Sequence, residues 1–318
     1  MRISIVTPYY NIPEHYFKPF LRSVLSQDWD DYELLIINDG STRPECLKLL
    51  EEVDDEHVRI LSKPNGGLSS ARNFGLANFS GDLLYIADPD DELKPGLFSF
   101  IAGAFDSDPS LDMLLFSTDC RSPEGKLRRK KHLESFTFTG DEAFASLCTQ
   151  GSFMEGYTWN KVYNVNRIGR DHFGLFDTTI TRHEDKLWAL KLMKWVKKGR
   201  ASDFVGYIYN LNPNGLTLDK SRRVRLQNSS YRAYDMILEY VESVAGRSSV
   251  YYEAMACYYC VCQWYLMQWI ADRKTEDPDR AMRKDKLRTL HRELKGKGVT
   301  SREYSWRKWL TPLVLLLT

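Results

Sequence analysis

The sequence lacks the features that mark secreted, membrane-spanning or disulfide-bonded proteins. It contains only six cysteines, and Cys46, Cys120 and Cys148 are scattered as in proteins with reduced thiols. The N-terminus leads directly into a strand pattern, without the charged region, apolar stretch and cleavage site of an export signal. We therefore expect a cytoplasmic protein whose cysteines are free.

Net charge is also nearly absent, because the 318 residues carry a formal charge of only +1. The charge is unevenly distributed: residues 219–318 hold 19 Lys and Arg against 12 Asp and Glu, which leaves an acidic balance in residues 1–218. With 43% apolar and 13% aromatic residues, the chain can bury a sizeable core. We predict one large domain over residues 1–218 and a basic, mainly helical region over residues 219–318.

Strand and helix signals alternate through the first 120 residues. The apolar pattern predicts strands at residues 3–7, 34–37, 58–61, 83–87 and 113–116, with helices at residues 13–27, 46–53, 68–77 and 97–105. Further along, it predicts an exposed basic loop at 126–131, an aromatic strand at 157–163, a helix from 184 to 195 and two or three helices beyond residue 218. Such alternation is typical of an α/β fold in which helices flank a mostly parallel sheet.

An acidic cluster, Asp88-Pro89-Asp90-Asp91, directly follows the apolar run at residues 83–87. Ligands of open α/β sheets bind at the carboxyl ends of the strands. Three carboxylates within four residues repel one another unless a cation lies among them, and oxygen ligands suit Mg²⁺ or Mn²⁺. The cluster therefore indicates a metal-held diphosphate of a nucleotide substrate. The alternative is a solvated acidic turn that Pro89 interrupts.

Other predicted strand ends carry polar residues of a consistent kind. Thr7-Pro8-Tyr9-Tyr10-Asn11 follows the first strand and Asn38-Asp39-Gly40-Ser41-Thr42 the second. The segment Asn65-Gly66-Gly67-Leu68-Ser69-Ser70-Ala71-Arg72-Asn73 is a glycine-rich entry into a helix. Its backbone N–H groups and Arg72 would suit an anion, although such an entry is often only a turn.

These segments, with Trp159-Asn160-Lys161 and His183-Glu184-Asp185, resemble the ordered motifs of bacterial family-2 inverting glycosyltransferases with the GT-A fold. The resemblance covers roughly residues 3–217. It departs from the usual pattern at Ala87, where a larger apolar residue is common, and at Pro89, which replaces a small polar residue and withdraws one N–H.

The resemblance implies a nucleotide-sugar donor, UDP-linked, and assigns a role to each matching position. Thr7, Pro8, Tyr10 and Asn11 would line the nucleoside pocket. Asp39 would accept a hydrogen bond from the base, and Arg72 would lie near the ribose or diphosphate. Asp90 would bind Mn²⁺ or Mg²⁺, Asp88 would touch the metal or the ribose, and Asp91 would support both.

The resemblance also implies the catalytic and acceptor residues. Inverting transfer is a single displacement that requires one general base. Asp185 matches the base position, and Glu184 beside it would hold a substrate hydroxyl or raise the pKa of the base. Trp159 would stack on a sugar, or else pack in the core. Asn160 and Lys161 would bind hydroxyls or phosphate.

Two other functions remain open at this point. A nucleotidyltransferase also presents acids and a metal at a sheet edge, but would carry glycines and basic residues where Pro8-Tyr9-Tyr10-Asn11 stands. A catalytically silent binding scaffold would not need both the Asp cluster and Glu184-Asp185. By resemblance, the acceptor is a saccharide or lipid-linked saccharide of bacterial envelope or exopolysaccharide synthesis, and we expect no nucleic-acid partner.

The C-terminal segment mixes tryptophans, basic residues and leucines over residues 306–317. It is far shorter than the ~20 apolar residues that span a bilayer, but it suits an anionic membrane surface. The alternative is a helix that packs on the protein itself or on a second copy of the chain.

Overall fold

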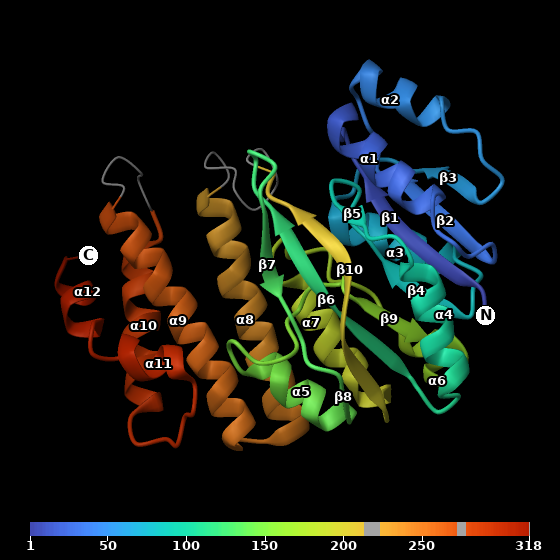
Figure 1. Cartoon of the computed structure of the whole chain (residues 1–318). Coiled ribbons are helices and arrows are strands. Elements are labelled where there is room, and N and C mark those ends of the chain that lie inside the picture. Colours follow the sequence, from blue (N-terminus) through green and yellow to red (C-terminus); the bar gives the residue numbers. More distant parts are fainter. Residues whose placement is uncertain (213–222, 272–277, 318) are drawn as a thin grey trace. The chain divides into compact units, whose positions relative to one another are not determined.

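Strands and helices alternate along the N-terminal part of the computed structural model, which describes residues 1–212, 223–271 and 278–317 (Figure 1). The strands are β1 (Ile3–Tyr9), β2 (Tyr32–Asn38), β3 (Val58–Ser62), β4 (Leu83–Ile86), β5 (Glu92–Leu93), β6 (Met113–Arg121), β7 (Leu127–Lys131), β8 (Phe136–Phe138), β9 (Lys161–Asn164) and β10 (Gly199–Asn210). The helices up to β10 are α1 (Glu14–Leu25), α2 (Pro44–Glu51), α3 (Leu68–Asn78), α4 (Leu97–Ser107), α5 (Gly140–Cys148), α6 (Val165–Ile168) and α7 (Glu184–Leu192).

The strands form one sheet in the order β3-β2-β1-β4-β9-β6-β10-β5, with β7 beside β6 and β8 beside β10. The pairs β3–β2, β2–β1, β1–β4 and β6–β10 are parallel, whereas β9 runs antiparallel to both β4 and β6. This confirms the predicted α/β fold with a mostly parallel, helix-flanked sheet.

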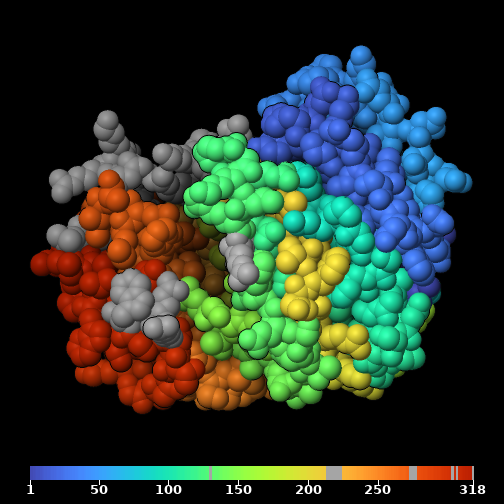
Figure 2. All heavy atoms as spheres, viewed as in Figure 1, coloured from blue at the N-terminus to red at the C-terminus, as the bar shows by residue number. Residues whose placement is uncertain are grey.

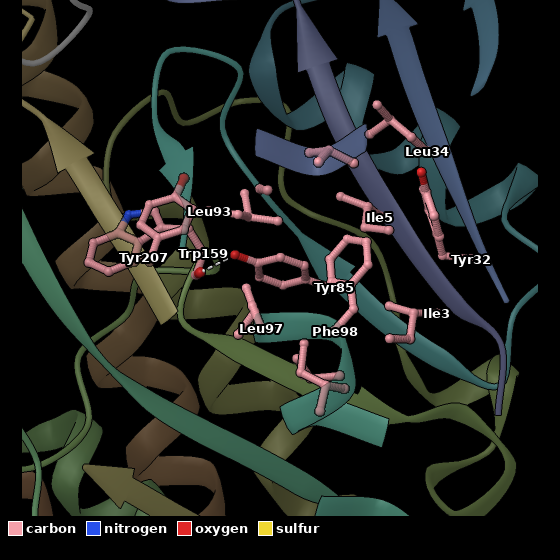
Figure 3. Packing of buried hydrophobic residues seen from close by; sticks show 14 of the residues in the cluster. Ile3, Ile5, Tyr32, Leu34, Tyr85, Leu93, Leu97, Phe98, Trp159 and Tyr207 are labelled. Atoms are coloured by element: carbon pink, nitrogen blue, oxygen red, sulfur yellow. Dashed lines mark hydrogen bonds between the residues drawn. The ribbon is translucent and has the colours of Figure 1, made fainter. Parts of the chain in front are cut away.

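Apolar residues on the two faces of the sheet explain how the helices pack. Ile3 and Ile5 of β1 belong to a buried cluster with Phe17 of α1 and Phe98 of α4. Figure 3 shows Tyr85 of β4 within this cluster, its hydroxyl donating to the carbonyl of Trp159. On the other face, α3 approaches β1 so closely at Gly75 that an added Cβ would lie 2.2 Å from Val6 Cγ1.

The chain divides into two compact units. One contains Met1–Ala143 and Gly156–Asp219, and the other contains Phe144–Glu155 and Lys220–Thr318. The predicted boundary at residue 218 falls outside the described residues.

The second unit is helical, as predicted for the C-terminal region. Its helices after β10 are α8 (Arg223–Ala245), α9 (Ser249–Ala271), α10 (Arg280–Leu294), α11 (Arg302–Arg307) and α12 (Thr311–Leu317). Figure 2 shows these orange-to-red segments packed closely against one another. The short earlier segment joins them, because Cys257 Sγ lies 3.1 Å from the carbonyl oxygen of Cys148 and the Phe144 and Tyr240 rings are 6.3 Å apart.

Several predicted elements need correction. Residues 127–131 form strand β7, not a loop, because basic side chains are common on strands at a sheet edge. The strand predicted at 157–163 begins only at Lys161, as β9, because the Lys161 N–H donates to the Thr158 carbonyl and closes a turn there. The described residues beyond 218 hold more than two or three helices, partly because Gly246 and Gly296 adopt the positive φ that ends helices.

No helix in the described ranges is long and apolar enough to cross a membrane.

Candidate functional site

The acidic turn emerges where β4 ends, and strand β10 holds it in place. The backbone N–H of Asp88 donates to the Tyr207 hydroxyl (3.2 Å), and that hydroxyl donates to the Asp91 carboxylate (2.8 Å). Asp91 also accepts from the Asn210 N–H at 2.7 Å. Burial and the charges of Asp90 and Asp88 raise the pKa of Asp91 well above its usual range. Asp91 is therefore a buried support for the turn.

Asp88 and Asp90 are the two acids that remain available to a ligand. Asp90 accepts a hydrogen bond from the Asn212 side chain at 3.3 Å. Burial and the nearby Asp88 charge raise the pKa of Asp90 to about 6. The described residues contain no group of three His, Cys, Asp or Glu side chains placed as metal ligands. Asp88 and Asp90 are nevertheless two neighbouring carboxylates whose negative charges repel each other, and such a pair suits a hard divalent cation. The cation would take its other ligands from diphosphate and water.

Arg72 lies between the acidic turn and the N-terminus of α7. This buried side chain donates to Glu184 Oε1 at 2.9 Å and to Asp88 Oδ1 at 3.3 Å. The remaining guanidinium nitrogen, Nε, is buried without a hydrogen-bond partner. Arg72 thus bridges one predicted metal-side acid and one predicted catalytic acid, two residues that are far apart in the sequence.

Helix α7 begins at the two acids predicted as catalytic. His183 precedes it with φ of 65°, a left-handed conformation that is uncommon for a residue other than glycine. Burial, with Asp185 as a secondary cause, raises the pKa of Glu184 to about 7, whereas Arg72 opposes the shift. Asp185 is half-buried and accepts from the Lys186 N–H at 2.7 Å. The pair therefore offers one buried carboxylate and one accessible carboxylate.

Asp39 follows β2 and is surrounded by donors from the glycine-rich loop. Its carboxylate accepts from Lys63 Nζ (2.5 Å), from the Gly66 N–H (3.0 Å) and from the Gly67 N–H (2.7 Å). The Asn65 amide donates to both its carbonyl (2.8 Å) and its carboxylate (3.2 Å). The N–H groups expected to bind a ligand anion at this helix entry thus bind the Asp39 carboxylate.

The predicted nucleoside-pocket residues lie at the end of β1 and just after it, beside the loop that follows β2. Asn11 has φ of 51°, and its side-chain oxygen accepts from the N–H groups of Thr42 (2.9 Å) and Arg43 (3.0 Å), so it joins the ends of β1 and β2. Thr7 and Pro8 are buried, and the Thr7 hydroxyl has no hydrogen-bond partner. Tyr10 is 46% exposed.

The three predicted acceptor residues are buried. The Trp159 ring stacks on Tyr207 at 5.1 Å with 3° between the planes (Figure 3). It also stacks on Tyr157. Trp159 therefore packs in the core, which is the alternative prediction for this residue. Its ring is 3% exposed and is covered by tyrosines, so it has no open face for a sugar. Lys161 is also fully buried and donates to the Asn160 side chain at 2.8 Å.

Three site residues were missed by the sequence reasoning: Tyr207, Asn210 and Asn212, which hold the acidic turn. The available signal was the run of aromatic and polar residues at positions 207–212. This signal could not predict that these residues contact the acidic turn, because β10 pairs with β5 across more than a hundred residues of sequence.

The sheet order and the helices that flank the sheet are those of the GT-A fold. The family model described as glycosyl transferase family 2 matches residues 4–179, and the chain belongs to this family.

Relatives and solved structures agree with this. EpsJ of Bacillus subtilis (strain 168), an uncharacterized glycosyltransferase, is 28% identical over 220 residues, which are 68% of this chain and 62% of EpsJ. A teichoic acid poly(glycerol phosphate) polymerase of Staphylococcus epidermidis is 26% identical over 62% of this chain and 26% of its own. The crystal structure of S. aureus TarS residues 1–349 in complex with UDP shares the fold, with a TM-score of 0.65 and 17% identity over 100% of this chain and 87% of that chain.

Proposed function

We propose that this chain transfers a sugar from a UDP-sugar to an acceptor hydroxyl with inversion at the anomeric carbon. The observation that carries the proposal is the Arg72 bridge, which holds Asp88 at the end of β4 and Glu184 at the start of α7 within one hydrogen-bonded group. Donor-side and acceptor-side acids are thus neighbours. The UDP-bound TarS structure, which shares the fold, supports a uridine donor.

In the proposed reaction, Asp185 acts as the general base. Its carboxylate takes the proton of the acceptor hydroxyl while the hydroxyl oxygen forms a bond to the anomeric carbon. The bond between that carbon and the diphosphate oxygen breaks on the opposite face, and UDP leaves. Glu184 is held by Arg72 and would fix the start of α7, which carries Asp185.

Asp90 and Asp88 would hold the divalent metal, Mn²⁺ or Mg²⁺. When bound, the metal neutralises negative charge on the diphosphate leaving group. Asp91 and Tyr207 keep the turn in shape, and Thr7, Pro8, Tyr10 and Asn11 lie on the nucleoside side of the site.

We place the acceptor among saccharides or lipid-linked saccharides of bacterial envelope or exopolysaccharide synthesis. The S. epidermidis relative, a teichoic acid poly(glycerol phosphate) polymerase, supports this setting. A lipid-linked acceptor would be met at a membrane, and α12 with the turn before it offers a suitable surface: Trp309 of the turn is 79% exposed, and Leu313 and Leu316 of the helix are 53% and 81% exposed. The ammonium of Lys308 lies 5.8 Å from the Trp309 ring centre, which combines a cation with an apolar face, as binding to anionic lipid requires.

A donor panel tests the proposed reaction. The chain is incubated with UDP-, GDP- and CDP-sugars, with Mn²⁺ or with a chelator, and the products are separated. Release of UDP together with sugar transfer or hydrolysis, only with metal, supports the proposal. Pyrophosphate chemistry would indicate a nucleotidyltransferase, and nucleotide binding without turnover would indicate a silent scaffold.

A further inference from the structure

Lys63 stands beside the carboxylate proposed to contact the donor base. Asp39 and Lys63 each follow the last residue of a strand in the neighbouring parallel pair β2 and β3, and the Lys63 N–H donates to the Asn38 carbonyl. The two side chains form an ion pair of 2.5 Å, and they are 4% and 14% exposed. The sheet register therefore brings a cation and an anion together at the nucleoside side of the site.

The donors around Asp39 differ in how easily a ligand can replace them. The N–H groups of Gly66 and Gly67 are fixed by the backbone at the entry to α3. The Lys63 ammonium is carried by a flexible side chain, and it also donates to the Pro64 carbonyl at 2.6 Å. Room for it depends on Gly66, where an added Cβ would lie 3.0 Å from Lys63 Nζ. The glycine backbone thus orients the carboxylate, while Lys63 is the donor that can move.

This pair matches the hydrogen-bonding edge of uracil. Uracil presents an N–H donor at ring position three, flanked by two carbonyl acceptors. A carboxylate accepts from the N–H, and an ammonium beside it donates to a flanking carbonyl. Cytosine has an acceptor nitrogen at position three and an amino group in place of the carbonyl at position four. Its ring nitrogen would therefore oppose the carboxylate, and its amino group would oppose an ammonium that donates to the position-four carbonyl of uracil. A site whose buried polar groups are left unpaired by the wrong base rejects it strongly.

We infer that Lys63 is a specificity-determining residue, which, together with Asp39, selects a uracil base over a cytosine base. This inference rests on the proposed function and deepens it, because it names the residue that restricts the donor to uridine nucleotides. A purely structural Lys63 would neutralise Asp39 without contributing to the choice of base.

The test measures the dissociation constants of UDP and CDP, with Mn²⁺, for the full chain and for three variants. Lys63→Met removes the charge and the donor, Lys63→Gln keeps a neutral donor, and Lys63→Arg keeps both. The control is Lys48→Met on α2, whose side chain is 75% exposed. Circular dichroism and thermal unfolding show which variants fold.

We expect the unchanged chain and Lys48→Met to prefer UDP over CDP by roughly 100-fold or more. Lys63→Met should weaken UDP binding by roughly 10- to 100-fold and CDP binding much less, so that the preference collapses. Lys63→Gln should fall between these values, and Lys63→Arg should retain most of the preference. An unchanged UDP-to-CDP ratio in folded Lys63→Met or Lys63→Gln would overturn the inference alone. Failure of the unchanged chain to bind UDP would overturn the proposed donor as well.

Discussion

Glu184 and Asp185 are adjacent in the sequence but lie in different electrostatic surroundings. Glu184 is buried and paired with Arg72, whereas Asp185 is more accessible and is contacted by a backbone N–H. A general base must reach its substrate and release its proton afterwards, so the accessible carboxylate is the better candidate. The buried one is better suited to holding its neighbour and Arg72 in position.

Asp185→Asn should therefore separate binding from chemistry. We expect transfer to fall by about 10² to 10⁴, the range that loss of general-base assistance produces, with donor affinity nearly unchanged. Single-turnover transfer and isothermal titration with UDP would measure the two effects. The exposed Asp171→Asn is the matched control. Normal transfer by Asp185→Asn would move the base to another residue.

Asp90 should destabilise the metal-free protein at neutral pH. Its folded-state pKa, about 6, lies above the usual value of an aspartate, so the folded chain holds this proton more tightly than the unfolded chain. Protonation of Asp90 therefore stabilises the folded chain fully below about pH 4, and this stabilisation is lost as the pH rises through 6.

Asp90→Asn removes this charge, and we expect it to raise the unfolding free energy of the metal-free chain at pH 8 by about 3 kcal/mol. The gain should shrink toward zero near pH 4, and metal-dependent donor binding should be lost. Urea unfolding at both pH values gives the measurement, with exposed Asp31→Asn as the control. An equal effect at pH 4 and pH 8 would argue against an unfavourable charge at Asp90.

At the scale of elements, the end of β10 determines the shape of the turn after β4. The Tyr207 hydroxyl joins the Asp88 N–H to the Asp91 carboxylate, and Asn210 supplies a second donor. Both the metal-side acids and their support thus depend on an element more than a hundred residues away.

Tyr207→Phe should consequently weaken the site without removing an acid. Loss of a buried hydrogen bond should cost about 1–3 kcal/mol of stability, because the Asp91 carboxylate loses a donor. We also expect weaker metal-dependent UDP binding, since the Asp88 backbone loses its tether. Half-exposed Tyr252→Phe serves as the control. Unaltered donor affinity in Tyr207→Phe would show that the turn keeps its shape without this contact.

The same contacts explain how much the sequence predicts. Local signals were sufficient for β1 to β4, for the helices between them and for the acids after β4, because apolar periodicity and strand-end polarity lie within short segments. Pairings such as Arg72 with Glu184, or Tyr207 with Asp91, join residues more than a hundred positions apart. Trp159 shows the same limit, since a single aromatic residue fits a core or a sugar site equally well until its neighbours are known.

At the scale of the whole molecule, charge and exposed apolar surface coincide in the C-terminal part. The exposed side chains Leu313 and Leu316 lie three residues apart on α12, and exposed Trp309 lies with Lys308 in the turn before this helix. Inserted leucines and an interfacial tryptophan would add apolar burial to the attraction between basic residues and anionic lipid.

Sedimentation with liposomes tests this surface. We expect the chain to pellet with vesicles containing anionic phosphatidylglycerol, less so in high salt, and weakly with neutral phosphatidylcholine. Replacing Trp309, Leu313 and Leu316 by serine should abolish pelleting, whereas Leu175→Ser, an exposed leucine of the other unit, should not. Equal pelleting of the triple variant would exclude this face. Dimers that disappear in the triple variant would instead identify a second copy as its partner.

The segment Phe144–Glu155 limits how the gene of this protein can recombine with the genes of its relatives. It belongs to the helical unit although sheet-forming chain precedes and follows it, and Cys148 and Phe144 lie against α9 and α8. The sheet-containing unit is therefore encoded by two separate stretches of the gene. A recombination event or stop codon near residue 219 would leave this segment without the helices that cover it. Exchange of the helical unit between related chains would have to replace two separate gene segments together.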